Sequence, residues 1–297
     1  EEAEREEAER EEQRLETEHE EQAAKENIKC AALGIPPGWD TSMSSWENSQ
    51  IQVFTDSWAM LFDNSKTVVR LGTFDEDVLV AVKTTFMPIV SSDKKRKKAE
   101  REKDILKKLR HSNVIQYFGH TKVNNQIHLA LEPIVTFELA SKRAVSNTLL
   151  RVVVQQTKLS LEERIDIIRQ LASALDYIHR EGLEQGLAHR DVKPTNILVN
   201  CDGVVKLTDL EFGKDITDSN MTASTTFAGG TQSWRAPEVA MAESNTKESD
   251  VFSFGLVLFY VLTGSHVLGD CRRKHPGLLL TLNGGKGYTH VQKTLVP

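Results

Sequence analysis

Three side chains that could take part in one reaction lie close together in the segment 189–199, whose sequence is HRDVKPTNILV. Asp191 offers a carboxylate, Lys193 an ammonium group and Asn196 a carboxamide oxygen. A carboxylate can accept a proton from a reacting hydroxyl. An ammonium group can offset negative charge, and a carboxamide oxygen is a hard ligand that suits Mg²⁺. The plainer alternative is an ordinary loop with scattered polar residues.

The order of residues in this segment resembles the catalytic loop of the eukaryotic protein-kinase family at every functional position. The resemblance implies that Asp191 orients the attacking hydroxyl and accepts its proton. It also implies that Lys193 neutralises the transferring phosphoryl group and that Asn196 binds magnesium. So many matches in a fixed order are not expected in an ordinary polar loop.

The same resemblance extends to residues on both sides of this loop. Lys83 follows the apolar run 80–82 and would contact the nucleotide phosphates, with Glu102 as its partner. Asp209 ends the run 204–208 and would bridge magnesium to the phosphates. Taken alone, Lys83 would be an exposed strand end and Glu102 part of a solvated helix face. The implied nucleotide-binding residues are Lys83, Glu102, Ala81, Leu131, Glu132, Lys193, Asn196 and Asp209, with Asn196 and Asp209 as metal ligands and Asp191 and Lys193 as catalytic residues.

Further matches indicate which kinases within the family the chain resembles. Lys193 and Thr231 favour Ser or Thr as the phosphate acceptor, and Asp250 matches a structural anchor rather than a catalyst. Scattered segments, including Phe74-Asp75, 113–118 and 252–266, are similar to the kinase part of the inositol-requiring kinase/endoribonucleases of the unfolded protein response. No ribonuclease activity is implied.

The elements that must position these residues change in type along the chain. Short β-branched runs at 67–69 and 78–82 predict strands, as do 114–118 and 127–131. A charged helix is expected over 94–109, and after Glu132-Pro133 the pattern turns helical and continues through 165–178. The sequence therefore predicts an α+β, two-lobed, protein-kinase-like fold with a small β-rich N-lobe and a helical C-lobe.

Composition shifts divide the chain into three regions. Residues 1–50 are expected to form an N-terminal charged helix and a linker, since a single charged helix or a disordered linker is favoured over a coiled coil. The kinase-like domain is expected over 51–270, with lobes at 51–132 and 135–270. The glycine-containing tail 271–297 predicts an irregular end and a C-lobe that is truncated before its last helices.

Charge and cysteine content exclude several other classes. The net charge of −6 gives no basic face for nucleic acid. Three widely separated cysteines predict neither a zinc site nor a disulfide framework, which favours a cytoplasmic setting. The apolar run 251–262 is too short for a membrane helix and is interpreted as a buried helix.

Two departures from the family pattern, together with the expected short C-lobe, keep a second function open. The segment 61–67 lacks the expected glycines, and Leu210-Glu211 follows Asp209 in place of Phe-Gly. The first hypothesis is a Ser/Thr protein kinase that uses ATP and Mg²⁺ on a protein substrate, with possible kinase–kinase self-association. The alternative is a pseudokinase or nucleotide-sensing scaffold that acts through partners.

Overall fold

The computed structural model describes residue 14 and the ranges 31–46, 49–64, 67–86, 93–124, 126–155, 159–181, 186–210, 214–215, 232–240 and 246–267. Most of the charged segment before residue 31 lies outside these ranges, so the choice between helix, linker and coiled coil stays a prediction. The tail 271–297 and the predicted loss of the last helices also lie outside the described residues.

The chain divides into two compact units. Unit 1 comprises residues 1–86 and 118–146, and unit 2 comprises residues 87–117 and 147–297. Strands dominate the described part of unit 1, and long helices dominate that of unit 2. The predicted two-lobed α+β fold is therefore confirmed.

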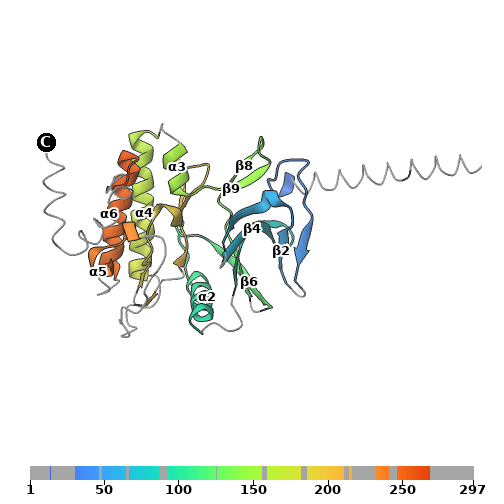
Figure 1. Ribbon diagram of the computed structural model, residues 1–297, viewed down its shortest axis with the longest axis horizontal. Helices are drawn as coiled ribbons and strands as arrows, with labels where there is room; N and C mark the ends of the chain where they lie inside the picture. The colour runs from blue at the N-terminus through green and yellow to red at the C-terminus, as the bar shows by residue number, and fades with distance from the viewer. Residues whose placement is uncertain are drawn as a thin grey trace, which may run out of the picture. The chain divides into compact units, whose positions relative to one another are not determined.

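A seven-stranded sheet builds unit 1 (Figure 1). Its order is β1-β2-β4-β5-β7-β6, and β3 pairs with β4 outside this path. The predicted strands at 67–69 and 78–82 are confirmed within β4 and β5, where β-branched residues suit a half-buried pleated surface. The strands are β1 (Met43–Ser45), β2 (Ile51–Phe54), β3 (Met60–Asp63), β4 (Thr67–Phe74), β5 (Val78–Phe86), β6 (Tyr117–Val123) and β7 (Gln126–Leu131), with the short 3₁₀ helix η1 (Ser57–Ala59) before β3.

The strand predicted at 114–118 is displaced in the structure. β6 begins only at Tyr117, whereas Val114 forms an isolated parallel bridge with Leu207 of unit 2. The backbone amide of Ile115 also donates to the Leu207 carbonyl, at 2.9 Å. These hydrogen bonds satisfy the backbone of the apolar run outside the large sheet.

The helical pattern expected directly after Glu132-Pro133 is wrong for residues 135–146, which form a second, two-stranded sheet in unit 1. β8 (Val135–Glu138) pairs antiparallel with β9 (Arg143–Ser146) directly after the segment 132–134. Phe137 of this hairpin packs against a core that we name the tryptophan cluster. The cluster consists of Leu33, Ile35, Trp39, Phe54, Trp58, Ala59, Leu71 and Ala144.

Unit 2 is organised around two packed helices, α4 and α6. On α4, Ile167, Leu171, Ala174, Leu175 and Ile178 are buried at helical spacing, which gives the helix one apolar face. A capping box at Thr246 starts α6, and Gly264, in the left-handed conformation, ends it. The helices are α2 (Asp93–Leu106), α3 (Leu149–Gln155), α4 (Leu161–Glu181), α5 (Pro237–Ala240) and α6 (Lys247–Thr263), with 3₁₀ turns η2 (Pro194–Asn196) and η4 (Gln232–Trp234).

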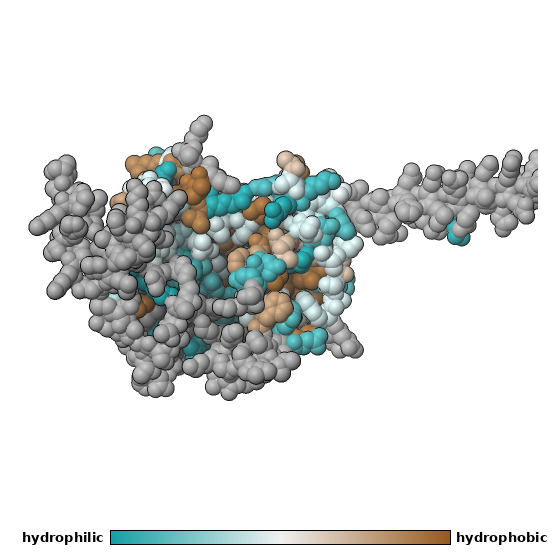
Figure 2. Space-filling view, in the orientation of Figure 1, coloured by the Kyte–Doolittle hydropathy of each residue, from teal (hydrophilic) through white to brown (hydrophobic). Residues whose placement is uncertain are grey.

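Two short ribbons complete the described part of unit 2. β10 (Leu187–Ala188) pairs with β13 (Lys214–Asp215), and β11 (Ile197–Val199) pairs with β12 (Val205–Leu207). None of the helices in the described ranges is long and apolar enough to span a bilayer. Hydrophobic residues are nevertheless visible on the surface over the α3 region (Figure 2), where Leu150 and Val154 are exposed.

Candidate active site

The three residues singled out in the segment 189–199 meet in space. The Lys193 Nζ atom lies 2.6 Å from Oδ2 of Asp191, and Nδ2 of Asn196 donates to the same oxygen at 2.9 Å. Asn196 also donates to the Asp191 carbonyl, at 2.8 Å. The carboxylate of Asp191 is thus held in one orientation by a cation and an amide.

Local structure explains why these side chains converge. Pro194 opens the 3₁₀ turn η2, where its fixed φ and missing N–H are tolerated. The backbone N–H of Asn196 then donates a hydrogen bond to the Lys193 carbonyl, at 3.0 Å. This turn reverses the chain and brings Asn196 back to Asp191.

Asp250 of α6 anchors the beginning of the loop. Its Oδ2 accepts a hydrogen bond from the His189 amide and its Oδ1 one from the Arg190 amide, both at 2.7 Å. The side chain of Asp250 is 1% exposed, so water cannot hydrate its carboxylate. The two backbone donors supply the hydrogen bonds that water would otherwise make. The structure agrees with the anchoring role that the resemblance gave Asp250.

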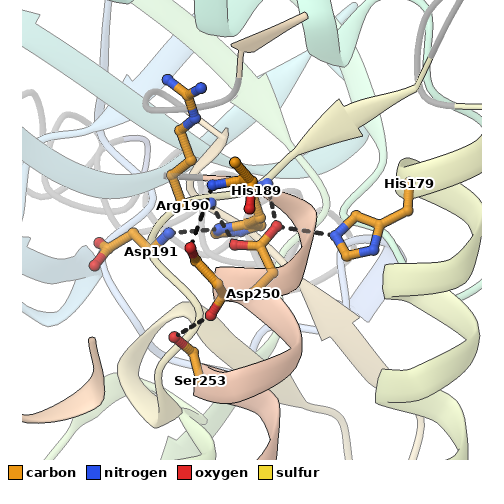
Figure 3. Close-up of polar contacts among 8 residues, drawn as sticks. His179, His189, Arg190, Asp191, Asp250 and Ser253 are labelled. Carbon is orange, nitrogen blue, oxygen red and sulfur yellow. Dashed lines mark hydrogen bonds and ion pairs between the residues drawn. The ribbon is translucent and has the colours of Figure 1, made fainter. Parts of the chain in front are cut away.

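A histidine that the sequence did not reveal joins this anchor. Nε2 of His179, from the last turn of α4, lies 2.9 Å from Oδ2 of Asp250. Figure 3 shows the His179 ring and the backbone nitrogens of His189 and Arg190 directed at one carboxylate. His179 and Asp250 are far apart in the chain, and a lone histidine at a helix end gives no signal of such a partner.

His189 connects the loop to the strand that precedes Asp209. Its Nδ1 accepts from the Asp191 amide at 3.2 Å, and its Nε2 lies 3.0 Å from the Thr208 carbonyl. A neutral imidazole with the proton on Nε2 satisfies both contacts. The buried ring therefore ties the backbone of Asp191 to Thr208.

Asp209 leaves the β11–β12 ribbon beside Asn196. Ile197 pairs with Leu207 in this ribbon, and the Thr208 amide donates to the Asn196 carbonyl at 3.0 Å. Asp209, the next residue, has φ 68°, and Arg190 has φ 70°. Non-glycine residues rarely adopt this left-handed region, and such strain concentrates at functional sites. The structure thus brings Asp191, Asn196 and Asp209 to one end of the ribbon.

The donor set at this end fits a magnesium ion. Nδ2 of Asn196 donates to Asp191, so its carboxamide oxygen is the atom that would bind a metal, and the carboxylate of Asp209 would be the second ligand. Across the described residues, no group of three or more His, Cys, Asp or Glu side chains forms a ready metal site. Mg²⁺ commonly binds through one or two protein oxygens plus phosphates and water, so two ligands suffice.

The residues implied in nucleotide contacts lie in two places. Lys83 and Ala81 are on β5, where Ala81 pairs with Leu131 at the end of β7 and Glu132 follows directly. The structure thus brings Ala81 and Leu131 together in unit 1. Asp191, Lys193, Asn196 and Asp209 belong to unit 2.

Glu102 is buried although the sequence around it is charged. It lies on α2 with a side chain that is 1% exposed, whereas Arg101 is exposed. Carboxylates are almost never buried without a partner. Glu102 belongs to unit 2 and Lys83 to unit 1, so their pairing stays a prediction.

The turn that takes the place of a glycine-rich loop is closed by its own side chain. The Asn64 amide donates to the Thr67 carbonyl at 3.0 Å, and the Thr67 amide donates to Oδ1 of Asn64 at 2.8 Å. Both backbone donors are therefore engaged within the turn. Asn64 and Thr67, the described residues on either side of positions 65 and 66, are therefore hydrogen-bonded to each other.

Comparisons with known proteins place this geometry in a family. A protein-family profile described as the protein kinase domain matches residues 64–278. The chain is 34% identical over 191 residues to a probable serine/threonine-protein kinase of Dictyostelium discoideum, covering 64% of this chain and 18% of that protein. It is 30% identical over 192 residues to a probable serine/threonine-protein kinase of Lactococcus lactis, covering 65% and 28%.

A plant receptor kinase shows similar identity. The chain is 34% identical over 190 residues to an L-type lectin-domain containing receptor kinase of Arabidopsis thaliana, covering 63% of this chain and 26% of that protein. The chain therefore spans less than a third of the length of these curated relatives.

Proposed function

Because the chain belongs to the protein kinase family, we propose that it transfers the terminal phosphoryl group of Mg-ATP to a Ser or Thr hydroxyl of a protein. The observation that carries this proposal is the convergence of Lys193 and Asn196 on Oδ2 of Asp191. A carboxylate fixed in this way can receive a proton without reorganising.

The residues of unit 2 divide the chemistry between them. The substrate hydroxyl oxygen forms a bond to the terminal phosphorus while the bond to the ADP oxygen breaks, and the hydroxyl proton passes to Asp191. Lys193, which lies 2.6 Å from Asp191, offsets the negative charge on the transferring group. The anchor at Asp250 keeps the loop in place throughout.

Asn196 and Asp209 would hold magnesium, which links the nucleotide phosphates to the protein and offsets their charge. In unit 1, Lys83 would contact the phosphates, and Ala81, Leu131 and Glu132 would contact the base. The pairing of Ala81 with Leu131 supports a common base-binding surface.

The alternative function, a nucleotide-sensing scaffold, is favoured by one specific contact. Oδ1 of Asn64 accepts a hydrogen bond from the Thr67 backbone amide. A glycine-rich loop would instead present such a donor to a phosphate oxygen. Nucleotide could then bind more weakly than in an active kinase. The contacts among Asp191, Lys193 and Asn196 in unit 2 favour catalysis over this alternative.

One assay separates the two functions. The purified chain is incubated with Mg-ATP and a generic Ser/Thr protein substrate, and phosphate transfer is measured beside nucleotide affinity by calorimetry. The proposal expects both binding and turnover. Binding without turnover would favour a nucleotide-sensing scaffold, and the absence of both would contradict phosphoryl transfer and favour a pseudokinase that acts through partners without nucleotide.

Substrate, partners and setting are finer proposals. A protein substrate follows from the family, whereas kinase–kinase self-association and a cytoplasmic setting rest on the sequence alone. Similarity to the inositol-requiring kinases also remains a proposal. Cross-linking of the purified chain at increasing concentration tests self-association.

A further inference from the structure

We propose that the β8–β9 hairpin and the segment 31–46 together position the backbone at 131–134 for the nucleotide, an inference that rests on the proposed function. The segment 31–46 precedes the residues 64–278 that match the family profile. Both segments nevertheless contribute to the tryptophan cluster of unit 1.

The backbone at 131–134 is fixed at both ends. Leu131 pairs with Ala81 at the end of β7, and Val135 pairs with Ser146 at the start of β8. Only the residues 132–134 lie between these strands, and Ile134 within them is buried. The position of the hairpin therefore determines the path of this segment.

Aromatic contacts hold the hairpin in that position. The Phe137 ring lies 5.7 Å from the Trp39 ring, nearly perpendicular to it at 89°, and 6.3 Å from the Trp58 ring. Trp39 and Trp58 are themselves in edge contact at 5.1 Å. Edge-to-face pairs of this kind add attraction beyond the burial of apolar area.

Hydrogen bonds join the segments that carry the two tryptophans to each other and to β4. Nε1 of Trp58 donates to the Asp40 carbonyl at 2.7 Å, which joins the segment 31–46 to η1. The Arg70 guanidinium of β4 donates to the carbonyls of Phe54, Thr55 and Asp56, just before η1. The cluster is thus built on a rigid support.

The hairpin also reaches the strand that leads to the turn at 64–67. β9 packs along β3 and against η1, and Ala144 of β9 is buried in the tryptophan cluster. β3 ends at Asp63, immediately before Asn64. The tryptophan cluster therefore links the segment 131–134, which is proposed to contact the base, to Asn64, which is proposed to lie on the phosphate side, within unit 1.

This linkage would favour nucleotide binding by preorganisation. A segment that is already ordered loses less conformational entropy when a ligand binds to it. If the hairpin detached, residues 132–134 would have to be ordered by the nucleotide itself. The expected consequence is weaker nucleotide binding without the loss of any direct contact.

The test compares two phenylalanines in the full chain. Phe137→Ala removes the hairpin's contact with both tryptophans, whereas Phe118→Ala removes a half-buried ring from the other core of unit 1. We expect Phe137→Ala to lower Mg-ATP affinity by about fivefold or more, and Phe118→Ala to leave it within about twofold. Phe137→Leu, which keeps apolar volume, should restore most of the affinity.

Amide hydrogen exchange provides a readout that does not depend on nucleotide. Exchange at Leu131, Glu132 and Ile134 should be faster in Phe137→Ala and unchanged in Phe118→Ala. Equal exchange and equal affinity in the two variants would overturn the positioning role. If the parent chain binds no nucleotide, the proposed function is wrong, and unchanged exchange in Phe137→Ala would separately overturn the role of the hairpin.

Discussion

Lys193 and Asn196 both contact the same carboxylate oxygen of Asp191, Oδ2. This arrangement predicts the effect of removing the charge of Asp191. Asp191→Asn should lower turnover by about a hundredfold or more, because the proton acceptor is lost. Nucleotide affinity should stay nearly unchanged, since Asp191 is not a proposed nucleotide or metal ligand. Steady-state kinetics and calorimetry on the same samples check this prediction, and equal turnover in variant and parent would remove Asp191 from the mechanism.

Asn64 is a second residue whose contacts predict a functional effect. Asn64→Gly should raise nucleotide affinity by about three- to tenfold, because the Thr67 amide becomes available for a charge-assisted hydrogen bond to phosphate. Calorimetric titration with Mg-ATP measures the change. Asn64→Ala is the matched control, since it frees the amide without glycine's flexibility, and a smaller gain is expected. No gain in either variant would show that the turn does not limit binding.

At the scale of elements, α6 supports the catalytic loop through one buried carboxylate. Asp250→Ala leaves the amides of His189 and Arg190 without their acceptor and should lower the free energy of unfolding by about 3–5 kcal/mol. Urea unfolding measures the loss. Asp176→Ala serves as the control, because its exposed pair with Arg180 on α4 should contribute less than about 1 kcal/mol. Similar losses in the two variants would contradict the anchoring role.

The sheet of unit 1 contains a histidine that should make its stability depend on pH. His128 on β7 is 1% exposed, and burial lowers its pKa from the ordinary 6.5 to about 4. Its Nδ1 lies 2.9 Å from Oγ1 of Thr84, its ring lies against Trp46, and no group in the described ranges hydrogen-bonds Nε2. The unfolded chain therefore binds the proton more readily than the folded chain.

This difference fixes the direction of the pH effect. The free energy of unfolding should fall by about 3 kcal/mol as pH decreases from about 6.5 to about 4, and the contribution is fully present above that range. Denaturant unfolding at several pH values checks it. His128→Phe should flatten the dependence, whereas substitution of the exposed His120 by Gln should leave it intact. An unchanged slope in His128→Phe would refute the assignment.

For the whole molecule, the folded unit extends beyond the segment that the family profile matches. Leu33, Ile35 and Trp39 are buried in the tryptophan cluster, although the match begins only at residue 64. A chain shortened to begin at residue 47 should lose roughly 5 kcal/mol of unfolding free energy from unit 1, because each buried apolar side chain contributes about 1.5–3 kcal/mol.

Far-ultraviolet circular dichroism during urea unfolding tests this boundary. A chain that begins at residue 31 is the control, and its stability should lie within about 0.5 kcal/mol of the full chain, because the cluster is intact. Equal stability of the two shortened chains would show that the segment 31–46 is dispensable.

The sequence by itself determined the features that depend on local patterns. β4, β5 and α4 follow from β-branched runs and from apolar residues at helical spacing, which reflect backbone geometry over a few residues. The ordered residues from His189 to Asn196 predicted that Asp191, Lys193 and Asn196 lie together for the same reason, since one turn brings them together, and their catalytic role is a proposal. These predictions required no knowledge of distant contacts.

Only the tertiary structure revealed the partners of that segment that no local pattern shows, such as His179 beside Asp250, whose anchoring role the resemblance had already implied. His179 and Asp250 meet through the packing of α4 on α6, and the β8–β9 hairpin is stabilised by Trp39 and Trp58 from elsewhere in the chain. The runs 135–137 and 144–146 are too short to be distinguished from a loop by pattern alone. A two-stranded hairpin is marginal in isolation, so it is the packing of the partly buried Phe137 against the tryptophan cluster and the burial of Ala144 within it that make this hairpin an element of the fold.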